Sequence, residues 1–259
     1  SYRGLMTCGS VWACPVCASR VTEARRAELQ AALETWRGFA VMAAFTLQHG
    51  REDKLADLLI DLKAAFQALA RDRQVKKLKQ QFGIIGTVSA FEVTHGAAGW
   101  HPHKHVLYLS ERELTTDEIR AFEREISARY RSILKKRGRY GGAASAVVFT
   151  AGGTNQAAAA YVTKGSWNSA AELTKSPVKA GRSGNRSPFE LLAAAETDKQ
   201  AAALFREYFY AFKGTHQVQY SRGLRALLGL GLERSDEDIA AVEDEGVVLA
   251  VIAPDVWLV

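Results

Sequence analysis

The chain has 259 residues, of which 47% are hydrophobic and 24% are charged, the proportions of a globular protein with a full core. Its formal net charge of +6 favours a polyanionic partner such as nucleic acid. No apolar run reaches the roughly 18 residues that a membrane-spanning helix needs, and no secretory signal opens the sequence. Three cysteines make a poor disulfide framework, so we expect a cytoplasmic protein.

Near the start, Cys14-Pro15-Val16-Cys17 forms a C-x-x-C turn, with Cys8 shortly upstream. Such a turn directs both sulfurs toward one centre, and zinc takes four ligands of this kind. We therefore predict a structural zinc knuckle. Its fourth ligand is a histidine, for which we choose His49, or an acid, a water or a residue upstream of Ser1. Free buried thiols are the alternative.

The next elements alternate between helices and strands. An amphipathic pattern predicts a helix over Val21–Trp36, and an apolar run predicts a buried strand over Phe39–Leu47. A long helical pattern follows over Lys54–Gln81, and a second strand over Ile84–Thr94. A glycine-rich turn then leads into a third strand, so the second and third strands are predicted to pair as an antiparallel hairpin.

The third strand, Trp100–Leu109, carries three of the six histidines in the chain. Side chains alternate across a strand, so His101, His103 and His105 share one face. Pro102 has no amide proton, and we expect regular pairing to begin after it. Imidazoles held side by side on a rigid strand are typical of a divalent-metal site, whereas a solvated histidine-rich strand start is the alternative.

Hairpin pairing also brings Glu92 close to His103 and His105. A carboxylate with two imidazoles forms a three-ligand site that leaves positions open for substrate oxygens. We predict that Glu92, His103 and His105 bind the metal, with His101 as a further candidate. An acid that faces water at a sheet edge is the alternative for Glu92.

In the second half, Thr115 caps a helix that runs to about Lys136, and Ala146–Thr150 forms a strand closed by Gly152-Gly153. The alanine-rich helix over Asn155–Lys164 places Tyr161 and Lys164 on one face. A neighbouring ammonium favours phenolate and can also hold a phosphate oxygen. Alone, a tyrosine and a lysine at this spacing are weak evidence for catalysis, but beside a metal site they become stronger evidence.

A loop over Gly165–Pro188 follows, then a helix over Phe189–Phe212 and a last sheet strand over His216–Ser221. We expect the basic residues of this loop to contact DNA, and a disordered excursion is the alternative; they are Lys175, Lys179, Arg182 and Arg186. The predicted domain limits are 1–38 for the knuckle and first helix, 39–230 for the main domain and 231–259 for a C-terminal appendage.

The cysteine knuckle, His101-Pro102-His103-Lys104-His105 and Tyr161-Val162-Thr163-Lys164, in this order, resemble the plasmid rolling-circle replication initiators. These belong to the single-tyrosine branch of the HUH endonuclease superfamily. The resemblance spans roughly Cys8 to Arg225 and implies an α+β fold. Its five-stranded antiparallel sheet is ferredoxin-like or RRM-like, is flanked by helices and has the histidines on the central strand.

The resemblance also implies a reaction. Tyr161 would attack a phosphodiester of single-stranded or hairpin origin DNA, leaving a 5′-phosphotyrosine and a free 3′-OH. Mg²⁺ or Mn²⁺ on Glu92, His103 and His105 would polarise the phosphate, and Lys164 would assist. A host helicase and polymerase are the implied partners.

Two residues depart from the family pattern. Lys104 stands where relatives often have an apolar residue; it faces away from the histidines, and we expect it to contact DNA. Ala157 stands where some relatives carry a glutamate that ends replication. Three other functions remain open from the sequence: a relaxase or transposase of the same superfamily, a zinc-stabilised DNA-binding protein without catalysis, and a plain metallohydrolase.

Overall fold

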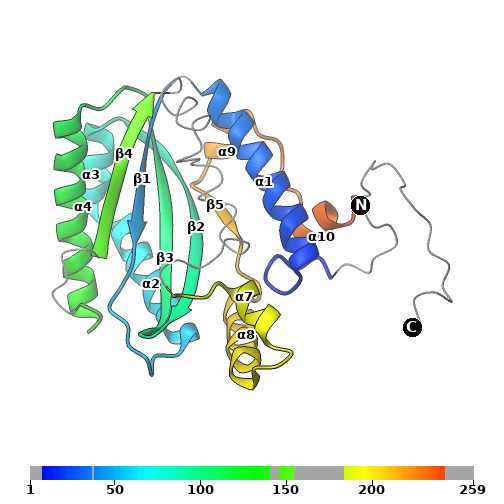
Figure 1. The fold of residues 1–259 in the computed structure, drawn as a ribbon. Helices are drawn as coiled ribbons and strands as arrows, with labels where there is room; N and C mark the ends of the chain where they lie inside the picture. Colours follow the sequence, from blue (N-terminus) through cyan, green and yellow to red (C-terminus); the bar gives the residue numbers. More distant parts are fainter. Residues whose placement is uncertain (1–7, 37, 141–145, 155–183, 243–259) are drawn as a thin grey trace.

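A computed structural model describes residues 8–36, 38–140, 146–154 and 184–242. Its centre is a five-stranded antiparallel sheet with the strand order β4-β1-β3-β2-β5, so β3 is the central strand (Figure 1). The strands are β1 (Phe39–Phe45), β2 (Ile84–Gly96), β3 (Gly99–Ser110), β4 (Val147–Thr154) and β5 (Val218–Tyr220). With helices packed around this sheet, the predicted α+β fold is confirmed.

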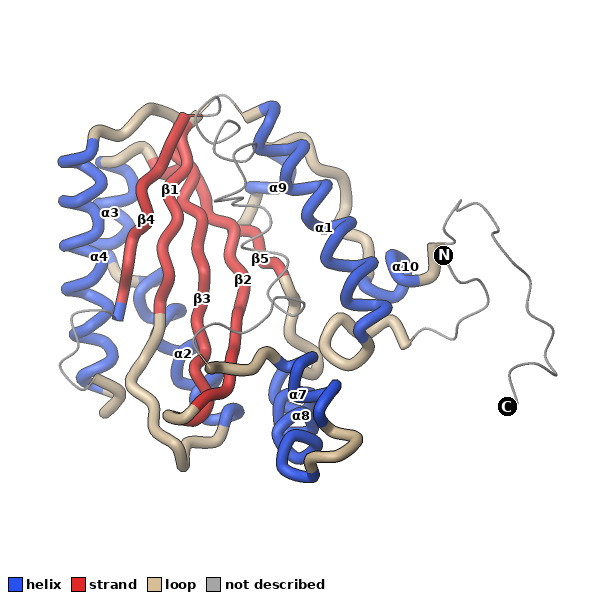
Figure 2. Tube along the Cα trace, viewed as in Figure 1, coloured by secondary structure: helices blue, strands red, loops and turns tan. Residues whose placement is uncertain are grey.

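Helices pack against both faces of the sheet (Figure 2). One face carries α2 (Leu55–Arg71), α3 (Arg73–Gln81), α4 (Thr116–Lys136) and α8 (Lys199–Phe212). The other face carries α1 (Pro15–Thr35) and α9 (Leu224–Leu227). Two short helices complete the fold, α7 (Pro188–Ala194) beside α8 and α10 (Asp236–Ala240) beside α1. None of the helices in the described ranges combines the length and the apolar content that a bilayer span requires.

The alternation of side chains along β3 produces two separate cores. Val106 and Tyr108 point into the larger core, with residues of α2, α4 and α8. Leu107 and Leu109 point the other way, into a smaller core with Leu29 of α1 and residues of α9. The larger core also contains apolar residues from the start of α1, so α1 is packed into both cores of the sheet domain. The proposed domain limits stay a prediction.

Two helical segments that we predicted as continuous are each divided by an aspartate cap. The Asp72 carboxylate accepts hydrogen bonds from the backbone N–H of Gln74 (2.7 Å) and of Val75 (3.1 Å), so α2 ends and α3 begins there. Asp198 caps α8 in the same way and separates it from α7. Capped ends satisfy N–H groups that lack a partner in the first helical turn, so two shorter helices replace one long helix.

The prediction that pairing begins after Pro102 is wrong, since Pro102 lies opposite Val93 in the β2–β3 ladder. The Pro102 carbonyl oxygen accepts a hydrogen bond from the Thr46 hydroxyl at 3.0 Å and therefore faces the β1 side. The amide nitrogen of a strand residue points to the same side as its carbonyl. There, pairing between β1 and β3 extends only to Phe45 opposite Lys104, so the proline costs no ladder hydrogen bond.

Other element limits differ by a few residues from the prediction. The first helix begins at Pro15 rather than Val21, because Cys14 occupies the N-cap position and proline suits the first helical turn. β4 continues through Gly152-Gly153 to Thr154, paired with β1. The helix after the Thr115 cap is confirmed, with a capping box formed by Thr115 and Glu118.

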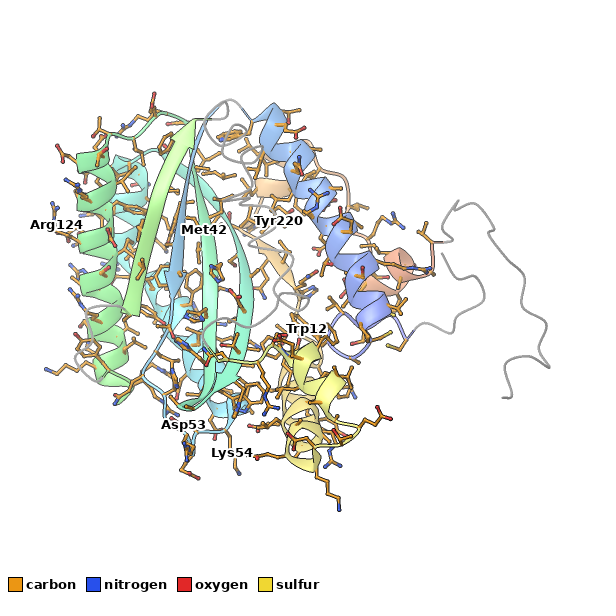
Figure 3. All side chains as sticks on the ribbon, in the orientation of Figure 1. Trp12, Met42, Asp53, Lys54, Arg124 and Tyr220 are labelled. Carbon is orange, nitrogen blue, oxygen red and sulfur yellow. The ribbon has the colours of Figure 1, made fainter. Side chains whose placement is uncertain are left out.

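The segment before α1 is anchored on α8. The Trp12 indole nitrogen donates a hydrogen bond to the carbonyl oxygen of Thr215 at 2.8 Å, and its ring lies 4.7 Å from the ring of Phe212. Figure 3 labels Trp12 at this junction between the start of α1 and α8. The cysteines on either side of Trp12 are thereby held against the body of the protein.

Candidate functional site

The β2–β3 hairpin places the predicted metal ligands on one face of the sheet. Glu92 lies directly opposite His103, and the neighbouring pairs are Thr94 with His101 and Ala90 with His105. Residues opposite each other in an antiparallel ladder point to the same face. This face is the one that α1 and α9 cover farther along β3, beyond the histidines. The predicted shared face of the histidines is confirmed.

The side chains in this group contact one another. The His105 Nε2 atom lies 2.6 Å from a Glu92 carboxylate oxygen, within hydrogen-bonding distance. The ring centroids of His101 and His103 are 4.1 Å apart, and those of His103 and His105 are 6.2 Å apart. The side chains of His105 and Glu92 are 15% and 20% exposed, so solvent reaches both.

Burial sets the protonation state of the middle histidine. Burial, together with the nearby charges of His101 and His105, lowers the pKa of His103 to about 3 against the opposing effect of Glu92. The pKa of His101 is also lowered, first by burial. His103 is therefore a neutral imidazole at pH 7, which is the form that binds metal ions.

Small residues flank the histidines on the sheet surface. Ala44 of β1 and Ala90 of β2 lie on either side of His105, and Val148 of β4 follows Ala44 in the same row. Val148 is 48% exposed although it is apolar. The two alanines therefore add no large side chain beside His105 on the sheet.

The donor set fits a divalent metal, because two imidazoles and one carboxylate suit Mn²⁺ and tolerate Mg²⁺. Three ligand atoms that all lie within 4.8 Å of one another could share one ion. Within the described ranges, however, the cysteine cluster meets this condition, and Glu92, His103 and His105 do not. Glu92 bonds to His105 instead of converging with both histidines. Shared coordination of one ion therefore requires this contact to open by side-chain rotation.

Cys8, Cys14 and Cys17 form that cluster, which could hold a metal such as zinc. Cys14 is the N-cap residue of α1. Burial opposes ionisation of Cys14, but the backbone N–H groups of Cys17 and Val16 and the other thiols outweigh it, so its pKa is lowered. Burial and the neighbouring Cys14 raise the pKa of Cys17 to about 11. A metal ion would favour the thiolate form of all three.

His49 is not a ligand of the cysteine cluster, and that prediction is wrong. Its ring lies 4.5 Å from the ring of His101, which places it beside the histidines of β3. The two residues are far apart in the sequence, and no periodic pattern links them. The contact arises because the segment after β1 crosses the tip of the β2–β3 hairpin.

The prediction that Lys104 contacts DNA is also wrong for this structure, because Lys104 is 3% exposed. It points away from the histidines into the helix-covered face. Its ammonium lies 4.1 Å from the ring centre of Phe91 and 5.0 Å from that of Phe66, and it donates a hydrogen bond to Gln219 at 3.2 Å. Burial, with a contribution from Lys63, lowers the pKa of Lys104 to about 7.

Arg186 lies at the histidine end of the sheet, where its backbone pairs with that of His95. Its side chain is 39% exposed and its guanidinium lies 3.4 Å from the Asp198 carboxylate, so Arg186 remains a candidate for DNA contact. The other predicted site residues lie outside the described residues: Tyr161, Lys164, Lys175, Lys179 and Arg182.

Comparison with known proteins adds independent information. No protein-family model and no solved structure matches the chain. A neomycin resistance protein from Streptomyces cyanogenus is 33% identical in an alignment 134 positions long, gaps included, that covers 41% of this chain and 31% of that protein. A protein named "Protein rep" from Streptomyces lividans is 31% identical in an alignment 318 positions long, gaps included, that covers 93% of this chain and 68% of that protein. Identity over nearly the whole chain, joined to the fold and the histidine face, shows that the chain belongs to the Rep family of plasmid replication proteins.

Proposed function

We propose that this Rep protein initiates rolling-circle replication by nicking single-stranded origin DNA through a covalent tyrosine intermediate. The observation that carries the proposal is the group formed by Glu92, His103 and His105 on one face of the sheet. A role in replication initiation follows from the family, whereas the nicking chemistry is our proposal.

In the proposed reaction, the phenolate oxygen of Tyr161 attacks the phosphorus of one phosphodiester. A bond forms between this oxygen and phosphorus, and the bond from phosphorus to the 3′ oxygen breaks. The 3′ oxygen takes up a proton and becomes the primer for a host polymerase, behind a host helicase. The phosphotyrosine keeps the energy of the broken bond, so a later 3′-OH can reverse the reaction and rejoin the strand without ATP.

Glu92, His103 and His105 would hold Mg²⁺ or Mn²⁺, which when bound stabilises charge on the phosphate oxygens. The neutral imidazole of His103 supports this role, because it offers a free lone pair at pH 7. Lys164, three residues after Tyr161 in the sequence, would favour the phenolate or hold a phosphate oxygen.

The described residues on either side of Tyr161 are compatible with its proposed role as the nucleophile. β4 ends at Thr154, which pairs with Phe39 at the end of β1 remote from His105. The described chain then resumes before Arg186, whose backbone pairs with His95 at the histidine end. Tyr161 belongs to the interval between these two ends, which lies outside the described residues.

The test is to incubate the protein with single-stranded origin DNA and Mn²⁺ and to run a denaturing gel. We expect a covalent protein–DNA band that is absent in Tyr161→Phe and in His105→Ala. Tyr210→Phe is the matched control, because Tyr210 is 70% exposed on α8 and should form the adduct at the rate of the unmodified protein. Cleavage that persists in Tyr161→Phe would instead indicate a metallohydrolase, and DNA binding without cleavage would indicate a non-catalytic protein.

A further inference from the structure

His49 extends the histidine group into a row of four imidazoles. Successive ring centroids along this row, from His49 through His101 and His103 to His105, are 4.5, 4.1 and 6.2 Å apart. Glu92 contacts the His105 end of the row. The metal site proposed above uses that end, which leaves His49 and His101 without an assigned role.

The position of His49 is fixed by several contacts between the segment after β1 and the hairpin tip. Arg51 donates two hydrogen bonds of 3.2 Å to the carbonyl oxygen of Ala97. Gly99 has φ of +86°, and a Cβ atom there would lie 2.8 Å from the Gly50 carbonyl oxygen, so the two backbones pass in close contact. Asp53 and Lys54, just beyond this segment, are labelled near the same end of the sheet in Figure 3.

A backbone carbonyl also orients the His49 ring. The His49 Nδ1 atom lies 3.4 Å from the carbonyl oxygen of Ala98. A carbonyl oxygen can only accept, so this contact favours the tautomer with the proton on Nδ1 and the lone pair on Nε2. Histidines that bind metals use the same arrangement, in which the second ring nitrogen donates to a carbonyl or carboxylate.

One ion is too small to use both ends of the row. Imidazole nitrogens bind divalent metals at about 2.1 Å, so two nitrogens on one ion are at most about 4.2 Å apart. An ion that Glu92, His103 and His105 share lies in the His103–His105 half of the row, whereas His49 contacts His101 in the other half. The length of the row therefore provides room for two ions.

We propose that His49 and His101 hold a second divalent cation on the sheet face, beside the ion of the nicking site. The proposal rests on the proposed function for the placement of the first ion. Two imidazoles without a carboxylate favour Co²⁺, Ni²⁺ or Zn²⁺ over Mg²⁺. With two protein ligands, the second ion keeps positions open for phosphate oxygens of the DNA strand next to the scissile bond.

Co²⁺ titration of the whole 259-residue chain tests this proposal. Cobalt that enters the cysteine cluster is recognised by its thiolate charge-transfer absorption and subtracted from the total bound in equilibrium dialysis. We expect two equivalents on nitrogen and oxygen ligands in the unmodified protein and one equivalent in His49→Ala. His216→Ala is the control, because His216 is exposed and lies outside the row, and it should bind two equivalents. Circular dichroism checks that each variant is folded.

The outcomes separate this proposal from the proposed function. Two equivalents in folded His49→Ala, or a single equivalent in the unmodified protein that is lost in His105→Ala, would overturn the second cation and leave the nicking site standing. The absence of any cobalt on nitrogen and oxygen ligands would overturn both metal positions. The second cation is supported if His49→Ala binds one equivalent of cobalt fewer while His216→Ala still binds two. The affinity of His49→Ala for its remaining equivalent should change less than twofold.

Discussion

Replacement of Lys104 by methionine tests the consequence of its burial. Burial lowers the pKa of Lys104 to about 7, whereas the unfolded chain keeps the proton up to the ordinary pKa of 10.5. At about 1.36 kcal/mol per pKa unit, the buried amine destabilises the folded state by about 4 kcal/mol at pH 7. The cation–π contacts with Phe91 and Phe66 offset about 1 to 2 kcal/mol of this cost. Lys104→Met should therefore raise the free energy of unfolding at pH 7 by about 2 to 3 kcal/mol.

The pH dependence gives this prediction a second readout. Because the pKa of Lys104 is lower in the folded protein, the destabilisation is complete below pH 7 and disappears as the pH rises toward 10.5. Methionine does not titrate, so the stability difference between Lys104→Met and the unmodified protein should shrink by about 2 kcal/mol between pH 7 and pH 9. Because residue 104 points away from the histidines, we expect nicking to be retained.

Urea unfolding followed by circular dichroism at pH 7 and pH 9 measures both quantities. Lys77→Met is the matched control, because Lys77 is exposed on α3 and its replacement should leave the free energy of unfolding within about 0.5 kcal/mol. A Lys104→Met protein that is less stable than the unmodified protein at pH 7 would refute the reasoning. A stability difference of equal size at both pH values would do the same.

Three further predictions concern the framework around the site. Gly99→Ala should lower the free energy of unfolding by about 2 kcal/mol or more, because it adds a Cβ atom at a φ of +86° against the Gly50 backbone; an unchanged urea midpoint would contradict this. Asp72→Ala should cost about 1 kcal/mol through loss of the α3 cap, and a change below about 0.3 kcal/mol would show that the cap is dispensable. Removal of metal from the cysteine cluster by a chelator should lower the melting temperature, and Cys14→Ser should melt at the chelated value with no further response to chelator. Equal melting temperatures with and without chelator would rule out a structural metal there.

The sequence predicts the histidine face well, because that part of the fold is local. A short turn joins β2 to β3, so the pairing register follows from few residues, and it places Glu92 opposite His103. Alternation along a strand then decides which side chains share a face. The same reasoning correctly places Lys104 on the opposite face.

Contacts between distant segments could not be predicted in this way. Alternation says that Lys104 points away from the histidines, but not that α2 and its Phe66 cover that face. His49 reaches His101 through a crossing of two backbones that no sequence period encodes. The breaks at Asp72 and Asp198 did carry a local signal, since aspartate is a preferred N-cap residue, but the helical periodicity continues through both positions.

The crossing at the hairpin tip also offers a place for a reporter group. Arg51 and His49 contact the carbonyl oxygens of Ala97 and Ala98, and the side chains of these two alanines are exposed. A genetically encoded fluorescent amino acid at residue 98 would therefore keep these main-chain contacts and stand a few residues from His101. Its emission would respond to an arriving oligonucleotide, so binding could be timed separately from strand cleavage.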